Sequence, residues 1–106
     1  MSIFNIFARK DINEGVKRFK ETKDAVLLDV RTREEYASGH IEGSQNIPLD
    51  EIDRVDSVVQ DKNAPLYVHC LSGGRSARAV AYLKAKGYGD VHDIGGISSY
   101  KDKIVV

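Results

Sequence analysis

A chain of 106 residues suits one domain with one hydrophobic core and leaves no room for two. Its 16 basic and 16 acidic side chains balance to a formal charge of zero, so neither nucleic acid nor an anionic membrane is expected as a partner. The single cysteine excludes an internal disulfide and a multi-thiolate zinc site, and the 3 histidines show no metal-ligand spacing, so we expect no metal and no cofactor.

Nothing in the sequence predicts an exported or membrane-inserted chain. No apolar run reaches the roughly 18 residues that a membrane-spanning helix requires. The apolar segment at residues 3–7 is too short for a signal peptide and has no positive charge before it. We therefore expect a cytoplasmic protein, with residues 1–10 as an N-terminal extension or edge segment and residues 11–106 as the folded domain.

Residues 3–7 are predicted to form a short edge strand or extended segment, and a helix is predicted at residues 11–21. Asp11 is a typical N-cap residue, and Glu14 three positions later completes the pattern of a capping box. Ile12, Val16 and Phe19 recur at helical spacing, which gives this helix one apolar face. Residues 25–28 form an unbroken apolar run, as expected of a parallel strand that is covered on both faces.

Helices and strands continue to alternate along the rest of the chain. Thr32, followed by acidic residues, predicts the start of a helix that ends at Ser38-Gly39. The later elements are predicted as a strand at 45–49, a helix at 50–60, a strand at 66–69, a helix at 76–86, a strand at 90–94 and a short helix at 97–102. This alternation implies parallel strands joined by crossovers, with helices on both faces of the sheet: a three-layer α/β domain.

The lone cysteine, Cys70, lies between the predicted strand at 66–69 and the helix at 76–86. In this position the backbone N–H groups of the loop and of the first helical turn point toward one sulfur atom. A free thiol titrates at ~8.5. A helix N-terminus favours a nearby negative charge by roughly 0.3–2 kcal/mol, which is enough to bring a thiolate near half-population at neutral pH. We therefore expect a reactive Cys70 with a lowered pKa.

The alternative is that Cys70 is a small buried apolar residue, as single cysteines often are. A core cysteine, however, has no need of Gly73-Gly74 and Arg75 directly after it. Glycines allow a loop to fold tightly around a ligand, and an arginine adds positive charge beside the sulfur. These neighbours favour the chemical interpretation.

Two charged residues, Asp29 and Arg31, follow the apolar run at 25–28. Ligand crevices in open α/β sheets lie at the carboxyl ends of the strands, so both are candidates for a supporting layer around the site. The interpretation that we favour is a structural ion pair that joins two loops. His69 directly precedes Cys70, but neighbouring side chains on a strand point to opposite faces, so we expect a buried imidazole rather than a Cys-His pair.

Two long motifs resemble the signatures of single-domain rhodaneses. Asp29-Val30-Arg31 together with residues 34–49 resembles the amino-terminal signature of that family. The segment from Cys70 to Ser76 resembles its active-site loop, and Gly95-Gly96 resembles its Gly-Gly pair near the carboxyl end. The resemblance covers nearly the whole chain from about residue 11 onward.

This resemblance implies a parallel five-stranded sheet with helices on both faces and a rhodanese-type sulfurtransferase activity. In that family the loop cysteine takes a sulfane sulfur from thiosulfate or a persulfide and passes it to cyanide or a thiol, in a small molecule or a protein. Cys70 would be the nucleophile, without a separate general base. The substrate-binding loop would consist of Leu71, Ser72, Gly73, Gly74, Arg75 and Ser76.

The chain departs from the family pattern at two places. Leu71, and the lack of a lysine or arginine before Arg75, make the loop less cationic than in many members that prefer thiosulfate. We therefore expect thiosulfate to be a poor donor and a persulfide or a protein to be the better one. Ile97 follows the glycine pair where the family often has tryptophan, which we interpret as a change in packing.

Two other functions stay open from the sequence. Cysteine-dependent phosphatases and arsenate reductases also combine a thiolate, loop amides and an arginine, but their loops usually have one residue more between cysteine and arginine than the four found here. The second is a sulfur-carrier or protein-interaction module that does not turn over. Cys70 argues against an inert domain but does not separate a carrier from an enzyme.

Overall fold

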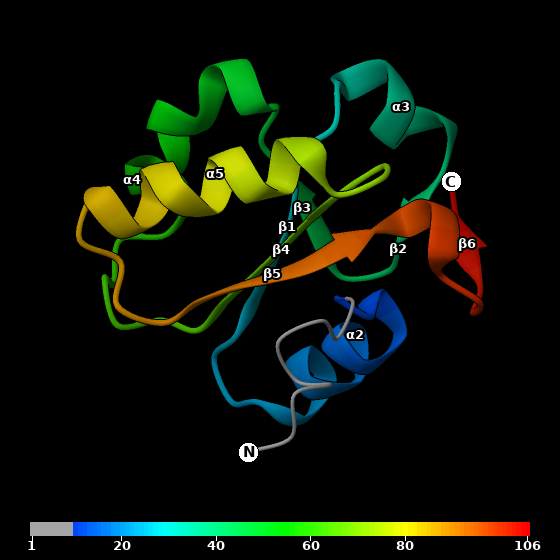
Figure 1. Ribbon diagram of the computed structural model, residues 1–106, viewed down its shortest axis with the longest axis horizontal. Coiled ribbons are helices and arrows are strands. Elements are labelled where there is room, and N and C mark those ends of the chain that lie inside the picture. The colour runs from blue at the N-terminus through cyan, green and yellow to red at the C-terminus, as the bar shows by residue number, and fades with distance from the viewer. Residues whose placement is uncertain (1–9) are drawn as a thin grey trace, which may run out of the picture.

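The computed structural model describes residues 10–106, which form a parallel sheet between two layers of helices (Figure 1). Four strands make up the sheet: β1 (Val26–Asp29), β3 (Ser44–Asn46), β4 (Leu66–Cys70) and β5 (Val91–Gly96). Their order is β3-β1-β4-β5, and every neighbouring pair is parallel. The expected α/β class with a parallel sheet is therefore confirmed. The fifth expected strand, at residues 3–7, lies outside the described residues.

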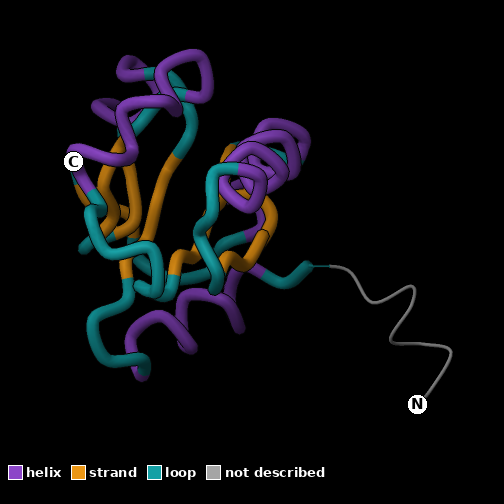
Figure 2. Tube along the Cα trace, turned by 90° about the vertical axis from the view of Figure 1, so that its left-hand side faces the viewer, coloured by secondary structure: helices purple, strands orange, loops and turns teal. Residues whose placement is uncertain are grey.

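Helices cover both faces of the sheet, as Figures 1 and 2 show from two directions. Helix α2 (Ile12–Glu21) packs on one face, and α5 (Gly74–Ala85) packs on the other beside the 3-10 helix η1 (Leu49–Arg54) and α4 (Val55–Val58). The short helix α3 (Arg33–Ser38) follows β1. No helix formed by residues 10–106 has the length and apolar character that a membrane span requires.

Two apolar clusters hold the layers together, one on each face of the sheet. They are separate because successive residues on each central strand point to opposite faces. Leu27 and Tyr67 face α2 and pack against Ile12 and Val16. The alternate positions, including Leu28 and Val68, belong to a larger cluster under α5 and α4. That cluster also contains Ile52, Val55 and Val59, which come from η1, from α4 and from the residue directly after α4. The strands are therefore fixed on both sides, and their carboxyl ends are held in place.

The N-terminal helix has the predicted N-cap residue, Asp11, but not the full capping box. The Asp11 side chain accepts a hydrogen bond from the N–H of Asn13 at 2.9 Å. Glu14 instead lies 3.5 Å from Arg18, one turn further along the helix. The cap therefore comes from the aspartate alone.

The sequence-based predictions differ from the structure in several element boundaries; the strand predicted at 45–49, for example, is Ser44–Asn46. The predicted helix at 50–60 is divided into η1 and α4 and ends at Val58. The predicted helix at 97–102 is only the 3-10 helix η2 (Ile97–Ser99), because the backbone becomes extended at Tyr100. The strand predicted at 90–94 continues through both glycines as β5. An antiparallel pair of short strands was also missed: β2 (His40–Ile41) pairs with β6 (Ile104–Val105). Two-residue strands show no periodicity from which to predict them.

Candidate active site around Cys70

The cysteine is the last residue of β4, and the loop after it leads into α5 four residues later. The parallel register of the sheet places Cys70 opposite Gly96, the last residue of β5. The residues after β5 therefore pass alongside the loop, and the Ser98 N–H donates to the Leu71 carbonyl at 3.0 Å. The loop is thus supported by two strands and by the start of a helix.

The sulfur of Cys70 accepts hydrogen bonds from the backbone. The N–H groups of Gly73 and Ser76 donate to Sγ at 3.0 and 3.3 Å, and the Ser76 hydroxyl oxygen lies 3.6 Å from it. The cysteine is only 1% exposed, so its sulfur lies beneath the loop rather than on the surface. Such donors stabilise an anion at this point.

Burial and hydrogen bonding act on Cys70 in opposite directions. Burial raises the pKa of the thiol, whereas hydrogen bonding with the Ser76 hydroxyl and hydrogen bonds from the N–H groups of Ser76, Gly73 and Ser72 lower it. The hydrogen bonds prevail, so the pKa of Cys70 lies below its ordinary value. A thiolate at near-neutral pH is a stronger nucleophile than a thiol.

The glycines around the loop differ in whether, and why, the structure excludes a side chain at each position. Gly73 has a φ of +112°, a left-handed conformation that a side chain would strain. Gly74 has an ordinary helical conformation, and a Cβ there would meet nothing within 4 Å. Gly96 is restricted by contact, because a Cβ would lie 2.3 Å from the Leu71 carbonyl oxygen and 2.6 Å from Ser72 Cα. The loop can therefore fold over β5 only because position 96 has no side chain.

Arg75 points to a carboxylate rather than lying free beside the sulfur. Its guanidinium donates two hydrogen bonds to Glu35 of α3, at 2.7 and 3.1 Å. Glu35 is also the third residue of α3, and it forms a reciprocal capping box with Thr32. The hydrogen bond from Arg75 is the main reason that the pKa of Glu35 falls to about 2. Arg75 thus connects the start of α5 to the start of α3.

Asp29 and Arg31 form a buried ion pair next to the site. The Arg31 guanidinium contacts the Asp29 carboxylate at 2.7 Å and also donates to the Gly39 carbonyl at 2.8 Å. The Asn46 amide donates to the backbone carbonyls of both residues. This geometry favours the structural role, because these contacts join the end of β1 to the residue after α3 and to the last residue of β3.

His69 is fully buried and does not pair with the cysteine sulfur. Its Nδ1 lies 3.4 Å from the backbone carbonyl of Cys70, and its Nε2 lies 3.9 Å from Asp29 Oδ2. His40 contacts the backbone as expected, with Nδ1 2.8 Å from the Tyr36 carbonyl. Within residues 10–106, no group of three or more histidine, cysteine or acidic side chains is placed to hold a metal ion.

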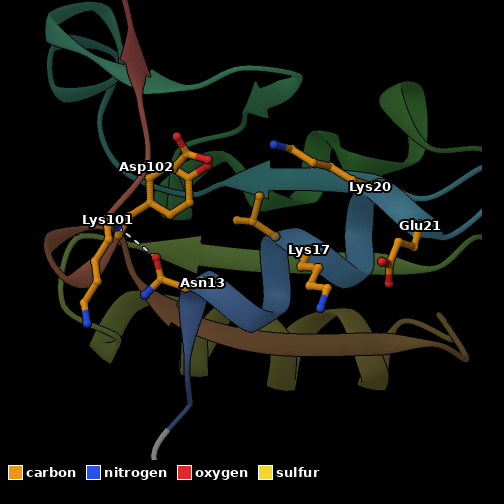
Figure 3. Close-up of a pocket in the computed structure, with 8 residues that line it drawn as sticks. Asn13, Lys17, Lys20, Glu21, Lys101 and Asp102 are labelled. Atoms are coloured by element: carbon orange, nitrogen blue, oxygen red, sulfur yellow. Dashed lines mark hydrogen bonds between the residues drawn. The ribbon is translucent and has the colours of Figure 1, made fainter.

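Two hollows differ in their relation to the loop. One, of about 470 Å³, borders the loop directly, and its lining consists of Lys10, Ser72, Gly73, Gly95, Gly96, Ser98 and Ser99. The other, of about 500 Å³, lies along α2 (Figure 3). Lys17 and Lys20 project there from the helix, opposite Lys101 and Asp102 of the segment after η2. The first hollow gives a small molecule a place against the loop that follows Cys70.

A protein-family model for the rhodanese-like domain matches residues 13–103, which include every residue of the Cys70 loop. The chain belongs to the rhodanese-like domain family.

Several relatives of this rhodanese-like domain are named as sulfurtransferases. Thiosulfate sulfurtransferase PspE of Escherichia coli is 39% identical over 71 residues, which are 66% of this chain and 68% of PspE. The adenylyltransferase and sulfurtransferase uba4 of Ogataea parapolymorpha is 34% identical over 90% of this chain, which spans 25% of uba4. The solved structure described as rhodanese with anions from E. coli superimposes with a TM-score of 0.71 at 35% identity, covering 76% of this chain and 96% of its own. These similarities place the chain in a sulfurtransferase class.

Three residues near the loop of this rhodanese-like domain were not predicted as part of the site. They are Glu35, which holds Arg75, Asp93, which accepts from the Ser76 hydroxyl at 2.9 Å, and Gly96, which lies under the loop. The glycine pair was noticed in the sequence, but only as a family motif. The two acids gave no local signal, because each contacts a residue far away along the chain.

Proposed function

We propose that this chain is a sulfurtransferase that carries a sulfane sulfur on Cys70 as a persulfide. The observation that carries the proposal is the set of backbone N–H groups directed at one cysteine sulfur at the junction of β4 and α5. The Cys70 thiolate would attack the outer sulfur of the donor, forming a new S–S bond to Sγ while the donor's own bond to that sulfur breaks. The donor leaves as a thiolate, or as sulfite when it is thiosulfate.

The second half of the reaction returns Cys70 to its starting state. An acceptor thiolate or cyanide attacks the outer sulfur, and Cys70 departs as a thiolate. The loop from Leu71 to Ser76 would surround the outer sulfur, whose negative charge its N–H groups stabilise. No metal or cofactor enters this scheme, since the electron pairs move only among sulfur atoms and the acceptor.

We propose a persulfide, of a small thiol or of a protein, as the better donor. Thiosulfate carries two negative charges, and within residues 10–106 two cations beside the loop are already paired: Arg75 with Glu35, and Lys10 with Asp93 at 3.5 Å. Leu71 is 42% exposed and adds apolar surface beside them. We expect a higher kcat/KM with a low-molecular-weight persulfide than with thiosulfate, measured with cyanide as acceptor. The reverse order would contradict this donor assignment.

The most direct test is mass spectrometry of the protein after exposure to a sulfane donor. We expect the intact chain to gain the mass of one sulfur atom, to lose it on addition of cyanide or a thiol, and to show no gain in the Cys70→Ala variant. Ser57→Ala, a change at an exposed serine of α4 away from the loop, serves as the matched control and should still be loaded. A wild-type chain that takes up no sulfur from thiosulfate or from a persulfide would contradict the proposed function.

The same preparation separates the remaining alternatives. A phosphatase would hydrolyse p-nitrophenyl phosphate, which a sulfurtransferase leaves intact. A carrier would take up sulfur once and release it only to one partner, whereas an enzyme would give repeated thiocyanate formation from donor and cyanide. We place the chain in the reducing cytosol, with residues 11–106 as the catalytic domain, because the proposed cycle needs a free thiol.

A further inference from the structure

A buried carboxylate lies close to Cys70 but has no place in the scheme above. The side chain of Asp93, on β5, is 7% exposed. Its Oδ1 accepts hydrogen bonds from the Ser76 hydroxyl at 2.9 Å and from the Gly95 N–H at 3.1 Å. Burying a negative charge is costly unless its hydrogen bonds are made, so the Ser76 hydroxyl is part of what keeps Asp93 in place.

The Ser76 hydroxyl has only one hydrogen to donate, but three acceptors lie around it. They are Asp93 Oδ1 at 2.9 Å, the Gly73 carbonyl at 3.0 Å and Cys70 Sγ at 3.6 Å. The charged oxygen is the strongest and the nearest of the three. While Cys70 is a thiol, the Ser76 oxygen can accept from its S–H and donate to Asp93, which satisfies all three side chains.

This arrangement changes when the thiol loses its proton to water. The thiolate then needs the Ser76 hydrogen that Asp93 holds, and two negative groups compete for one donor. A persulfide avoids the competition, because its inner sulfur is uncharged and its negative charge lies one atom further from Asp93. Building on the proposed function, we propose that Asp93 is a positioning residue that acts through Ser76 to disfavour the bare Cys70 thiolate relative to the sulfur-loaded form.

Other charged and titratable groups surround the contacts from Cys70 through Ser76 to Asp93, and most of these groups are already paired. On the side of Cys70, Arg75 is held by Glu35, and His69 lies near the Asp29–Arg31 pair. On the other side Lys10 lies 3.5 Å from Asp93 Oδ2 with its side chain 56% exposed, so its effect is partly screened. Beyond Asp93 is a hollow whose titratable side chains are Asp11, Glu14, Arg18, Tyr67 and His92.

The test is the pH dependence of Cys70 alkylation by iodoacetamide, which needs no sulfur donor. In Asp93→Asn the amide keeps the size of the side chain but not its charge, so the Ser76 hydroxyl can turn to the thiolate. We expect the midpoint of the rate profile to move down by about one pH unit, the effect of one hydrogen bond gained by the thiolate. In a Ser76→Ala background the same substitution should move the midpoint much less, because the connecting hydroxyl is gone.

Two further variants keep the result decisive. Asp90→Asn removes a half-exposed carboxylate that pairs with His92 instead of Ser76, and should leave the midpoint where it is. Lys10→Gln, a change at an exposed side chain, should move the midpoint up at low salt, and it decides the question if Asp93→Asn does not fold. A midpoint that stays or rises in folded Asp93→Asn, or an equal shift with and without Ser76, overturns the proposal. Failure of the wild-type chain to take up sulfur would instead overturn the proposed function and leave these midpoints unaffected.

Discussion

At the scale of single residues, position 96 is the most restricted in the site. The Cys70 loop crosses β5 at this point, and the Leu71 carbonyl and Ser72 Cα occupy the space that any side chain would need. Both contacts are to backbone, which cannot rotate away as a flexible side chain could. The shape of the loop, and with it the direction of the N–H groups at the sulfur, therefore depends on a residue 26 positions after the cysteine.

We predict that Gly96→Ala displaces the Cys70 loop. The added methyl group should lower the free energy of unfolding by about 1–3 kcal/mol, as overpacking does, and slow the alkylation of Cys70 because its N–H donors move. Denaturant unfolding and iodoacetamide rates measure the two effects. Gly89→Ala is the matched control, since a Cβ there meets only a carbonyl oxygen at 3.9 Å, an ordinary contact. Equal behaviour of the two variants would show that the close approach at position 96 has no consequence.

At the scale of elements, the two helices that border the loop are joined by one ion pair. Glu35 belongs to the first turn of α3 and Arg75 to the first turn of α5, so the pair connects two helix starts that are 40 residues apart. The side chains are 30% and 32% exposed, so solvent weakens the interaction without removing it. This pair also explains why Arg75 is not free to attract an anionic donor.

We predict that Glu35→Gln destabilises the protein by about 1 kcal/mol at neutral pH, a value reduced for solvent screening. Because Arg75 lowers the pKa of Glu35 from 4.5 to about 2, the stabilisation is complete above 4.5 and is lost as the pH falls toward 2. Denaturant unfolding across this range should therefore show the two proteins converging in acid. Glu34→Gln, at an exposed position on the same helix, is the control and should match the wild type throughout. A Glu35→Gln deficit that persists unchanged at the acid end would contradict the ion pair as its cause.

At the scale of the whole molecule, one buried imidazole links overall stability to pH. His69 lies at the centre of the sheet with no exposed surface, and its Nε2 has no hydrogen-bond partner within residues 10–106. Burial lowers its pKa below the ordinary 6.5, an effect that nearby Asp29 only partly offsets. At a given pH, His69 therefore binds a proton less readily in the folded state than in the unfolded chain.

We predict that stability falls as the pH drops below 6.5, toward the lowered pKa of folded His69. The loss is at most about 1.4 kcal/mol per pH unit for one proton. Urea unfolding at several pH values measures this slope, and in His69→Gln the part of it due to the buried imidazole should be absent. His92→Gln, a change at a half-exposed imidazole, should retain the slope. A wild-type chain of constant stability across this range would refute the prediction.

The sequence by itself determined the features that depend on residues close together along the chain. The apolar runs at 25–28 and 66–69, the caps at Asp11 and Thr32 and the position of Cys70 before a helix all follow from local patterns, and the structure has them where they were predicted. The family could also be predicted from the sequence, since its motifs are continuous stretches of the chain.

Only the tertiary structure decided what lies around the cysteine. The partner of Arg75, the close approach at Gly96 and the contact between Asp93 and Ser76 each join residues between 17 and 40 positions apart. The β2–β6 pair joins segments still further apart. A sequence pattern records which side chains share a face of one element, whereas these contacts arise only when parallel strands bring their carboxyl ends together.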